Sequence, residues 1–99
     1  MSTAIEKPFY VYILSDLLHN VLFVGVTTDL KNKVSQHKQG AFEDFTKRFK
    51  VNNLVYYEVT GDSLDAISRE IQLKDYSRKK KIGLIEGINP RWEDLFNKI

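Results

Sequence analysis

The sequence has no cysteine, only two prolines and no long apolar run, and these scarcities exclude several classes of protein. Without cysteine there is neither a disulfide framework nor a cysteine metal site, which suits a reducing compartment. The longest apolar run, Val21 to Val26, is far too short to span a membrane. Residues 1–8 include Glu6 and lack an apolar core, so we expect no signal peptide. These absences predict a cytoplasmic protein without membrane association.

The chain has 99 residues, which is enough for one hydrophobic core but too few for a separate substrate domain. We therefore expect a single domain over residues 1–99. The net charge is only +2, from 15 basic and 13 acidic residues. Such a balance is weak evidence for any particular partner, so the distribution of the charges matters more than their sum.

Basic residues gather in two parts of the chain, and such clusters attract phosphate groups by releasing counterions. The first part contains Lys31, Lys33, Lys38, Lys47, Arg48 and Lys50, and the second contains Arg78, Lys79, Lys80 and Lys81. In the first part the basic residues outnumber two acids, Glu43 and Asp44. The alternative interpretation is a solvated lysine-rich surface that binds nothing.

The pattern of apolar residues predicts three strands and three helices. Residues 9–14 alternate, with Phe9, Val11 and Ile13 on one face of the first strand. The predicted strands are 9–14, 21–26 and 54–59; the predicted helices run from a cap at Thr28 or Asp29 to about Lys38, and over 64–76 and 78–86. Residues 41–50 are predicted to form a basic loop or a short helix.

On the first predicted helix, Leu30 and Val34 form the apolar stripe, and Lys33 and His37 lie beside it. Polar residues in that position are half-buried at the rim of a core, where a site can form. For His37 the alternative is a histidine near a helix C-terminus, where the helix dipole favours it.

On the second predicted helix, Ile67 and Ile71 are the expected apolar stripe, and Glu70 lies beside it. The alternative for Glu70 is a surface ion pair with Lys74, four residues later. Tyr12, on the first strand, also has a plain alternative as one aromatic residue of an amphipathic strand.

Several short segments nevertheless follow one another in a particular order. They are YVYIL at 10–14, GVT at 25–27, FTK at 45–47, LVYYE at 54–58, Ala66, Arg69-Glu70, RKK at 78–80 and NPRWEDL at 89–95. Together they resemble the GIY-YIG nuclease family, and most of all its small stand-alone bacterial members. Each segment alone is a weak signal, whereas their order over residues 9–95 is a strong one.

The resemblance implies an α/β (α+β) fold in which a three-stranded antiparallel sheet is flanked by helices, with a GIY-YIG-like core at about residues 8–86. It also implies one weakly bound divalent ion, Mg²⁺ or Mn²⁺, and the family position of its ligand falls on Glu70. One carboxylate plus several waters is a plausible shell for Mg²⁺.

The resemblance also assigns the catalytic positions. Tyr12 matches the tyrosine that acts as general base near the attacking water, and Phe23 stands at the position of a second tyrosine. Lys33 matches an arginine that stabilises the phosphate, and His37 lies close by. Asn89 is a less certain match to an asparagine that some relatives use near the site. A tyrosine can serve as base only where a nearby cation lowers its pKa.

Two of these positions depart from the family pattern. Phe23 removes a hydroxyl from the site, and Lys33 keeps the positive charge but loses the planar fork that grips two phosphate oxygens. Asn32 also replaces a frequent arginine. Losing one preorganised donor can cost roughly 10²–10³ in rate, so we expect cleavage to be slow.

Three functions therefore remain open. The first is a metal-dependent endonuclease that hydrolyses phosphodiester bonds of DNA, and the second is a nucleic-acid-binding module that no longer cuts. The third is a structural or protein-interaction domain, which the low net charge favours. The residues expected to bind nucleic acid are Lys47, Arg48, Arg78, Lys79, Lys80 and Lys81.

Overall fold

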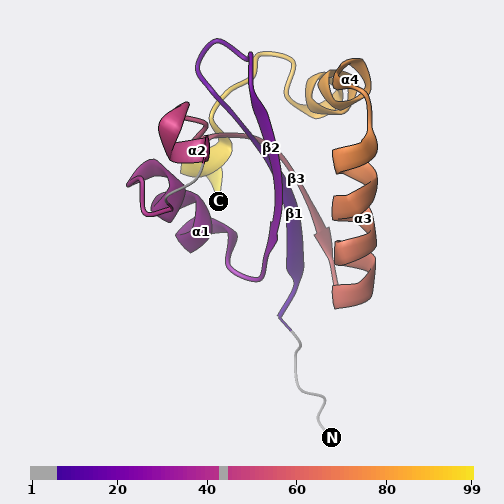
Figure 1. Ribbon diagram of the computed structural model, residues 1–99. Coiled ribbons are helices and arrows are strands. Elements are labelled where there is room, and N and C mark those ends of the chain that lie inside the picture. The colour runs from indigo at the N-terminus through magenta and orange to yellow at the C-terminus, as the bar shows by residue number, and fades with distance from the viewer. Residues whose placement is uncertain (1–6, 43–44) are drawn as a thin grey trace, which may run out of the picture.

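The computed structural model describes residues 7–42 and 45–99. Within this part, three strands form one antiparallel sheet in the order β2-β1-β3, and helices cover both of its faces (Figure 1). The strands are β1 (Phe9–Ser15), β2 (Leu22–Thr27) and β3 (Asn53–Thr60). The helices are α1 (Leu30–Lys38), α2 (Phe45–Arg48), α3 (Ser63–Asp75), α4 (Arg78–Ile88) and the short 3-10 helix η1 (Leu95–Lys98). The predicted fold class is confirmed.

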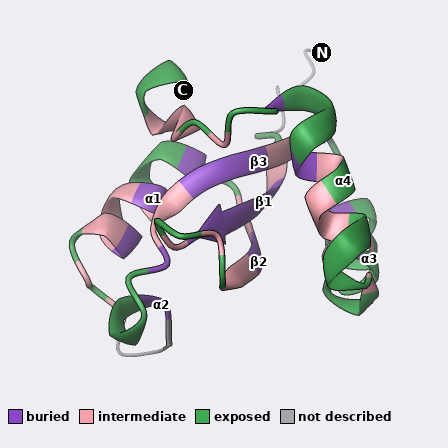
Figure 2. Cartoon of the chain, turned by 90° about the horizontal axis from the view of Figure 1, so that it is seen from above, coloured by how far each residue is buried: buried purple, intermediate pink, exposed green. Residues whose placement is uncertain are grey.

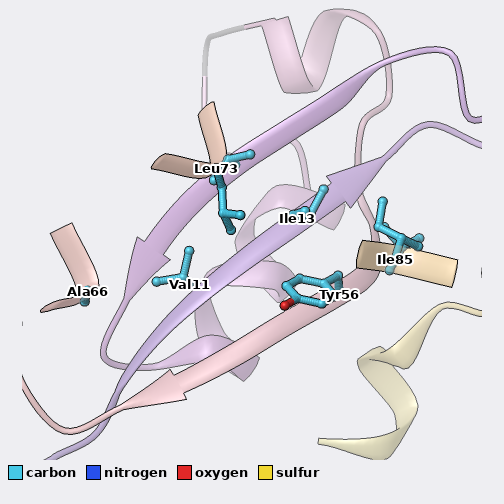
Figure 3. Packing of buried hydrophobic residues seen from close by; sticks show 8 residues of the cluster. Val11, Ile13, Tyr56, Ala66, Leu73 and Ile85 are labelled. Carbon is cyan, nitrogen blue, oxygen red and sulfur yellow. The ribbon is translucent and has the colours of Figure 1, made fainter. Parts of the chain in front are cut away.

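One face of the sheet packs against α3 and α4. Val11 and Ile13 of β1 point to this side, as their alternation predicted, and contact a layer made by Ala66, Leu73 and Ile85 (Figure 3). All five side chains are buried. Figure 2 shows the same arrangement from above, with β1 buried between its neighbours and much of the outer surface of α3 exposed.

The opposite face packs against α1 and the C-terminal segment. Tyr12 and Leu14 of β1 point to this side and form a second cluster with Leu30, Val34 and Leu54. Asp29 caps α1 by accepting a hydrogen bond from the backbone of Asn32, at 3.2 Å. The predicted helix start and its apolar stripe are both confirmed.

The predicted stripe of α3 is wrong. Ile67 and Ile71 are 48% and 62% exposed, whereas Ala66 and Leu73 are completely buried. Residues seven apart return to the same side of a helix after two turns, so these two define the line that contacts the sheet. The small Ala66 allows a close approach there. Arg69 and Glu70, which lie on either side of this line, therefore flank the contact with the sheet.

No helix in the described residues is long and apolar enough to cross a membrane.

Candidate active site

A hollow of about 200 Å³ lies beside the edge strand β2 and is lined by residues from β1, β2, α1 and α3. Its lining includes each residue that the sequence nominated as catalytic or metal-binding, namely Tyr12, Phe23, Lys33, His37 and Glu70. Gly25, Val26 and Phe42 complete it. Glu70 comes from the far face of the sheet, and it reaches the hollow because β2 is the outermost strand on that side.

Gly25 makes room for Tyr12. The two residues are partners in the ladder between β1 and β2, and the tyrosine ring lies across the neighbouring strand. A Cβ atom on Gly25 would lie 2.6 Å from both the hydroxyl and the nearest ring carbon of Tyr12. A glycine inside a strand often marks such a close approach, and that signal was available in the sequence although we assigned Gly25 no role.

A buried chain of polar groups begins at the Tyr12 hydroxyl. This oxygen lies 3.3 Å from Nε2 of His37, and Nδ1 of the same ring lies 3.2 Å from Oγ1 of Thr46. A neutral imidazole carries one ring proton, so the two contacts are linked. In the tautomer that donates from Nδ1 to Thr46, Nε2 accepts the proton of Tyr12. Thr46, on α2, was not predicted as a site residue.

Aromatic rings and one lysine line another part of the hollow. The ring of His37 lies 5.3 Å from that of Phe23 and 4.6 Å from that of Phe42, measured between centroids. The ammonium group of Lys33 lies 4.8 Å from the centroid of Phe42, within the range of a cation–π contact. Lys33 thus places a positive charge at the hollow, and Phe42 is a second residue that sequence reasoning missed.

The position of Glu70 is compatible with both of its predicted roles, as a metal ligand and as the ion-pair partner of Lys74. Its carboxylate lies 3.3 Å from the ammonium group of Lys74, and its side chain, only 18% exposed, lines the hollow. Among residues 7–42 and 45–99, no three His, Cys, Asp or Glu side chains gather closely enough to enclose a metal. One carboxylate at a hollow would suit a hydrated Mg²⁺ or Mn²⁺, since Mg²⁺ commonly keeps several waters.

A separate polar cluster lies on the other side of α3. Arg69 donates from Nε and Nη2 to the carboxylate of Glu58 on β3, at 2.8–3.2 Å, and Tyr56 donates its hydroxyl to the same carboxylate. The hydrogen bonds from Arg69 lower the pKa of Glu58. Burial, and then the hydrogen bond to Glu58, raise the pKa of Tyr56 to about 12.

The two groups of basic residues lie on opposite faces of the sheet. Lys47 and Arg48 belong to α2, on the α1 side, whereas residues 78–81 begin α4 on the other side (Figure 1). Arg78 is engaged elsewhere, because its guanidinium donates to the backbone oxygens of His19 and Asn20. The fold therefore does not join these two groups of basic residues into one continuous surface.

Asn89 does not line the hollow. Its side chain is buried and donates to the backbone oxygens of Val55, at 3.0 Å, and Glu93, at 2.9 Å. Its Oδ1 accepts from the backbone N–H of Glu93 at 3.0 Å. These bonds hold the turn after α4 against β3, so the expected role of Asn89 near the site is wrong and its role is structural.

Comparison with known proteins agrees with this fold. The family described as the GIY-YIG catalytic domain matches residues 8–83. The chain belongs to the GIY-YIG family, as the order of its motifs predicted. That membership supports a nuclease-like fold and implies interaction with nucleic acid in general.

Within the family, the chain is similar to small proteins named UPF0213. It is 34% identical over 77 residues to one from Staphylococcus haemolyticus, covering 78% of this chain and 93% of that protein. It is 35% identical over 86 residues to one from Pediococcus pentosaceus, covering 87% and 90%. The solution structure of a UPF0213 protein from Bacillus halodurans superimposes with a TM-score of 0.56 at 26% identity, covering 88% of this chain and 92% of that one.

Proposed function

We propose that this protein is a slow endonuclease that hydrolyses phosphodiester bonds of DNA with the help of a divalent cation. The observation that supports the proposal is the convergence, in one hollow of about 200 Å³, of a tyrosine–histidine pair, a lysine and a carboxylate. Hydrolysis of a phosphodiester needs an activated water and positive charge against the developing negative charge. Each of these needs has a matching side chain.

Tyr12 and His37 are the groups that would handle the proton. The Tyr12 hydroxyl accepts a proton from the attacking water while it passes its own proton to Nε2 of His37, across the 3.3 Å contact. The hydroxide bonds to phosphorus, the P–O bond to the leaving sugar oxygen breaks with its electron pair on that oxygen, and the oxygen takes a proton from solvent water. Thr46 supports this step, since its hydroxyl accepts from Nδ1 and keeps the imidazole in the tautomer with a free electron pair on Nε2. The aromatic rings around His37 limit the access of bulk water.

Lys33 and Glu70 are the groups that would handle charge. The Lys33 ammonium binds a non-bridging oxygen of the scissile phosphate as a point charge. Glu70 would hold a hydrated Mg²⁺ or Mn²⁺, which would supply positive charge near the phosphate. Because Lys74 contacts the same carboxylate, the ion is expected to bind weakly.

A second candidate, a nucleic-acid-binding module that no longer cuts, is favoured by a specific observation. Phe23 presents a ring without a hydroxyl to the hollow, and Tyr12 is almost completely buried. A water molecule must reach the Tyr12 oxygen for hydrolysis, so a permanently closed ring cluster would permit binding alone. A cytoplasmic location and a preference for DNA over RNA stay predictions.

One set of assays separates these candidates. The purified protein is incubated with single-stranded, duplex and branched DNA and with RNA, in Mg²⁺ or Mn²⁺. We expect slow cleavage of a DNA substrate that is lost in Glu70→Gln and kept in Asp75→Asn, an exposed acid on the same helix. Cleavage that survives Glu70→Gln would remove Glu70 from the mechanism. Binding without cleavage, by a folded protein, would favour the second candidate.

A further inference from the structure

Neighbouring hollows lead away from the candidate active site along the α1 face. His37 lines the site and also a second hollow of about 300 Å³, which we call the basic hollow. Lys50 and Asn52 line the basic hollow and also a third, of about 530 Å³, which we call the apolar hollow. Shared lining residues therefore connect the site, through the basic hollow, to the loop between β1 and β2.

Lysine side chains line the basic hollow. They are Lys38, which is paired with Asp94, together with Lys47 and Lys50. Arg48, which is exposed, lies next in the chain and stacks its guanidinium 5.5 Å from the ring centroid of Phe49. A strand of nucleic acid that leaves the site would meet these cations with its phosphates.

The apolar hollow carries a patch of exposed apolar side chains. Leu17 and Leu18, at the tip of the β1–β2 hairpin, are 79% and 75% exposed, and Phe49 beside them is 51% exposed. Isolated surface leucines are ordinary, but large apolar side chains gathered around one hollow mark an interaction surface.

The hairpin that presents these leucines is held in place from several sides. The carboxylate of Asp16 accepts a backbone hydrogen bond from Asn20, at 2.7 Å, and a second one within the loop. Arg78 donates to the backbone oxygens of His19 and Asn20, and the ring of His19 stacks on Trp92 at 4.1 Å. A loop ordered before binding loses less conformational entropy when a partner arrives.

We propose that Leu17, Leu18 and Phe49 form a platform for unpaired bases of a nucleic-acid strand whose backbone follows the basic hollow to the active site. This inference rests on the proposed function. Unpaired bases fit because leucine and phenylalanine side chains cannot hydrogen-bond to the edges of base pairs, whereas they can contact the exposed face of any base. Single strands and unpaired ends of branched DNA have such faces.

A second copy of the chain fits the platform less well. In a two-fold symmetric contact the same patch meets itself. The cations beside the platform, Arg48 and Lys50, would then face their own copies at close range. Like charges brought together in this way oppose association.

The test measures binding of a fluorescent oligothymidine of about 12 nucleotides, within the usual range of site sizes, and of an abasic strand of the same length. The variant Leu17→Ser/Leu18→Ser is expected to bind oligothymidine about tenfold or more weakly than the wild type, because two leucine side chains lose their apolar contact with the bases, with an unchanged salt dependence. Leu64→Ser, at a 72% exposed leucine of α3, is the matched control and should bind normally. The wild type should bind the abasic strand at least as weakly as the variant, which keeps Phe49, binds oligothymidine.

The basic hollow is tested in the same assay. Lys47→Ala/Lys50→Ala should lower the slope of log K against log salt by about 0.7 for each lost phosphate contact, whereas Lys7→Ala/Arg91→Ala, at two exposed cations that do not line the basic hollow, should leave it unchanged. A slope that stays unchanged in Lys47→Ala/Lys50→Ala, or that changes only in the control pair, would overturn the proposed path. Circular dichroism confirms that each variant is folded.

Two outcomes would overturn the platform itself. One is equal affinity of the wild type for base-bearing and abasic strands. The other is a leucine variant that binds normally while its self-association, measured by sedimentation, is lost, which would identify the tip as an interface between copies. If cleavage dependent on Glu70 persists in either case, the proposed function stands and only the platform fails. Absence of nucleic-acid binding at low salt would overturn both.

Discussion

Two polar regions flank the same helix, and adjacent residues of α3 serve them. Arg69 belongs to a closed cluster in which the Glu58 carboxylate accepts hydrogen bonds from the guanidinium and from Tyr56. Glu70 lines a hollow, and its carboxylate lies 3.3 Å from the ammonium group of the exposed Lys74. The first region pairs its charges internally, whereas the second keeps a carboxylate turned toward a cavity.

The difference teaches how a structural ion pair can be told from a candidate site in this chain. Both regions hold a carboxylate, a cation and a tyrosine, so residue types alone do not separate them. In the closed cluster a bidentate contact saturates the carboxylate, which favours its charged form and lowers its pKa. In the hollow, the carboxylate of Glu70 is held by one lysine and lines a cavity, while the tyrosine bonds to a histidine.

The largest expected effect comes from a substitution that disturbs the hollow and leaves the closed cluster intact. In Gly25→Ala the new methyl group would overlap the ring of Tyr12, which is buried and cannot simply swing away. We expect a loss of about 1–3 kcal/mol in the free energy of unfolding, as overpacking typically costs. Urea denaturation measures it.

Gly83→Ala is the control for that prediction. No atom lies within 4 Å of the position of a Cβ on Gly83, which is inside α4. Alanine favours a helix over glycine by up to about 1 kcal/mol, so this variant should be unchanged or more stable. If Gly25→Ala behaves in the same way, the close packing of Tyr12 against β2 is wrong.

The next largest effect is expected from two substitutions that restore the family pattern in the hollow. Phe23→Tyr returns a hydroxyl, and Lys33→Arg returns the planar fork that grips two phosphate oxygens. We expect the double variant to cleave DNA at least about tenfold faster than the wild type, which is below what two such donors can contribute. Single-turnover cleavage rates measure the gain.

That gain must depend on the rest of the site. It should vanish when Glu70→Ala or Tyr12→Phe is added. A folded double variant without any gain would show that the site has diverged beyond these two positions, and binding without cleavage would become the better description.

A smaller effect concerns the closed cluster and depends on pH. The pKa of Glu58 is lowered in the folded protein, so its contribution to stability is present above the unfolded value, about 4.3, and is lost as the pH falls through the lower folded value. Glu58→Gln should therefore cost about 1 kcal/mol at neutral pH, as expected for a partly exposed pair, and progressively less as the pH falls through the lower folded pKa of Glu58.

A double-mutant cycle with Arg69→Met isolates this interaction. In the Arg69→Met background, Glu58→Gln should change the free energy of unfolding far less, and cleavage should not depend on the pair. A coupling energy that does not fade in acid would contradict the assignment of the pair.

The smallest expected effect concerns the ion pair between Glu70 and Lys74. Lys74→Ala removes the ammonium group that lies 3.3 Å from its carboxylate. Since exposed ion pairs contribute at most about 1 kcal/mol, Mn²⁺ should bind about two- to fivefold more tightly. Paramagnetic broadening of backbone signals measures the affinity, Lys79→Ala is the control, and broadening that survives Glu70→Ala would remove Glu70 as the ligand.

Local patterns in the sequence were enough to predict much of the fold. The alternation of Val11 and Ile13 against Tyr12 and Leu14 predicted the two faces of β1, and the structure confirms both. The predicted cap at Thr28 or Asp29 also predicted the start of α1, and the structure has Asp29 there. These signals work because strand alternation and helix capping depend on neighbours only a few residues away.

The order of the motifs predicted the family and nominated the residues that line the hollow. Tertiary structure decided which side of α3 contacts the sheet, and the apolar pair Ile67 and Ile71 was misleading because Ala66 and Leu73 dock instead. It also brought Thr46 and Phe42 to His37 and placed Arg78 against the hairpin. These contacts join elements that are separate in the chain, so they depend on how elements dock and not on local spacing.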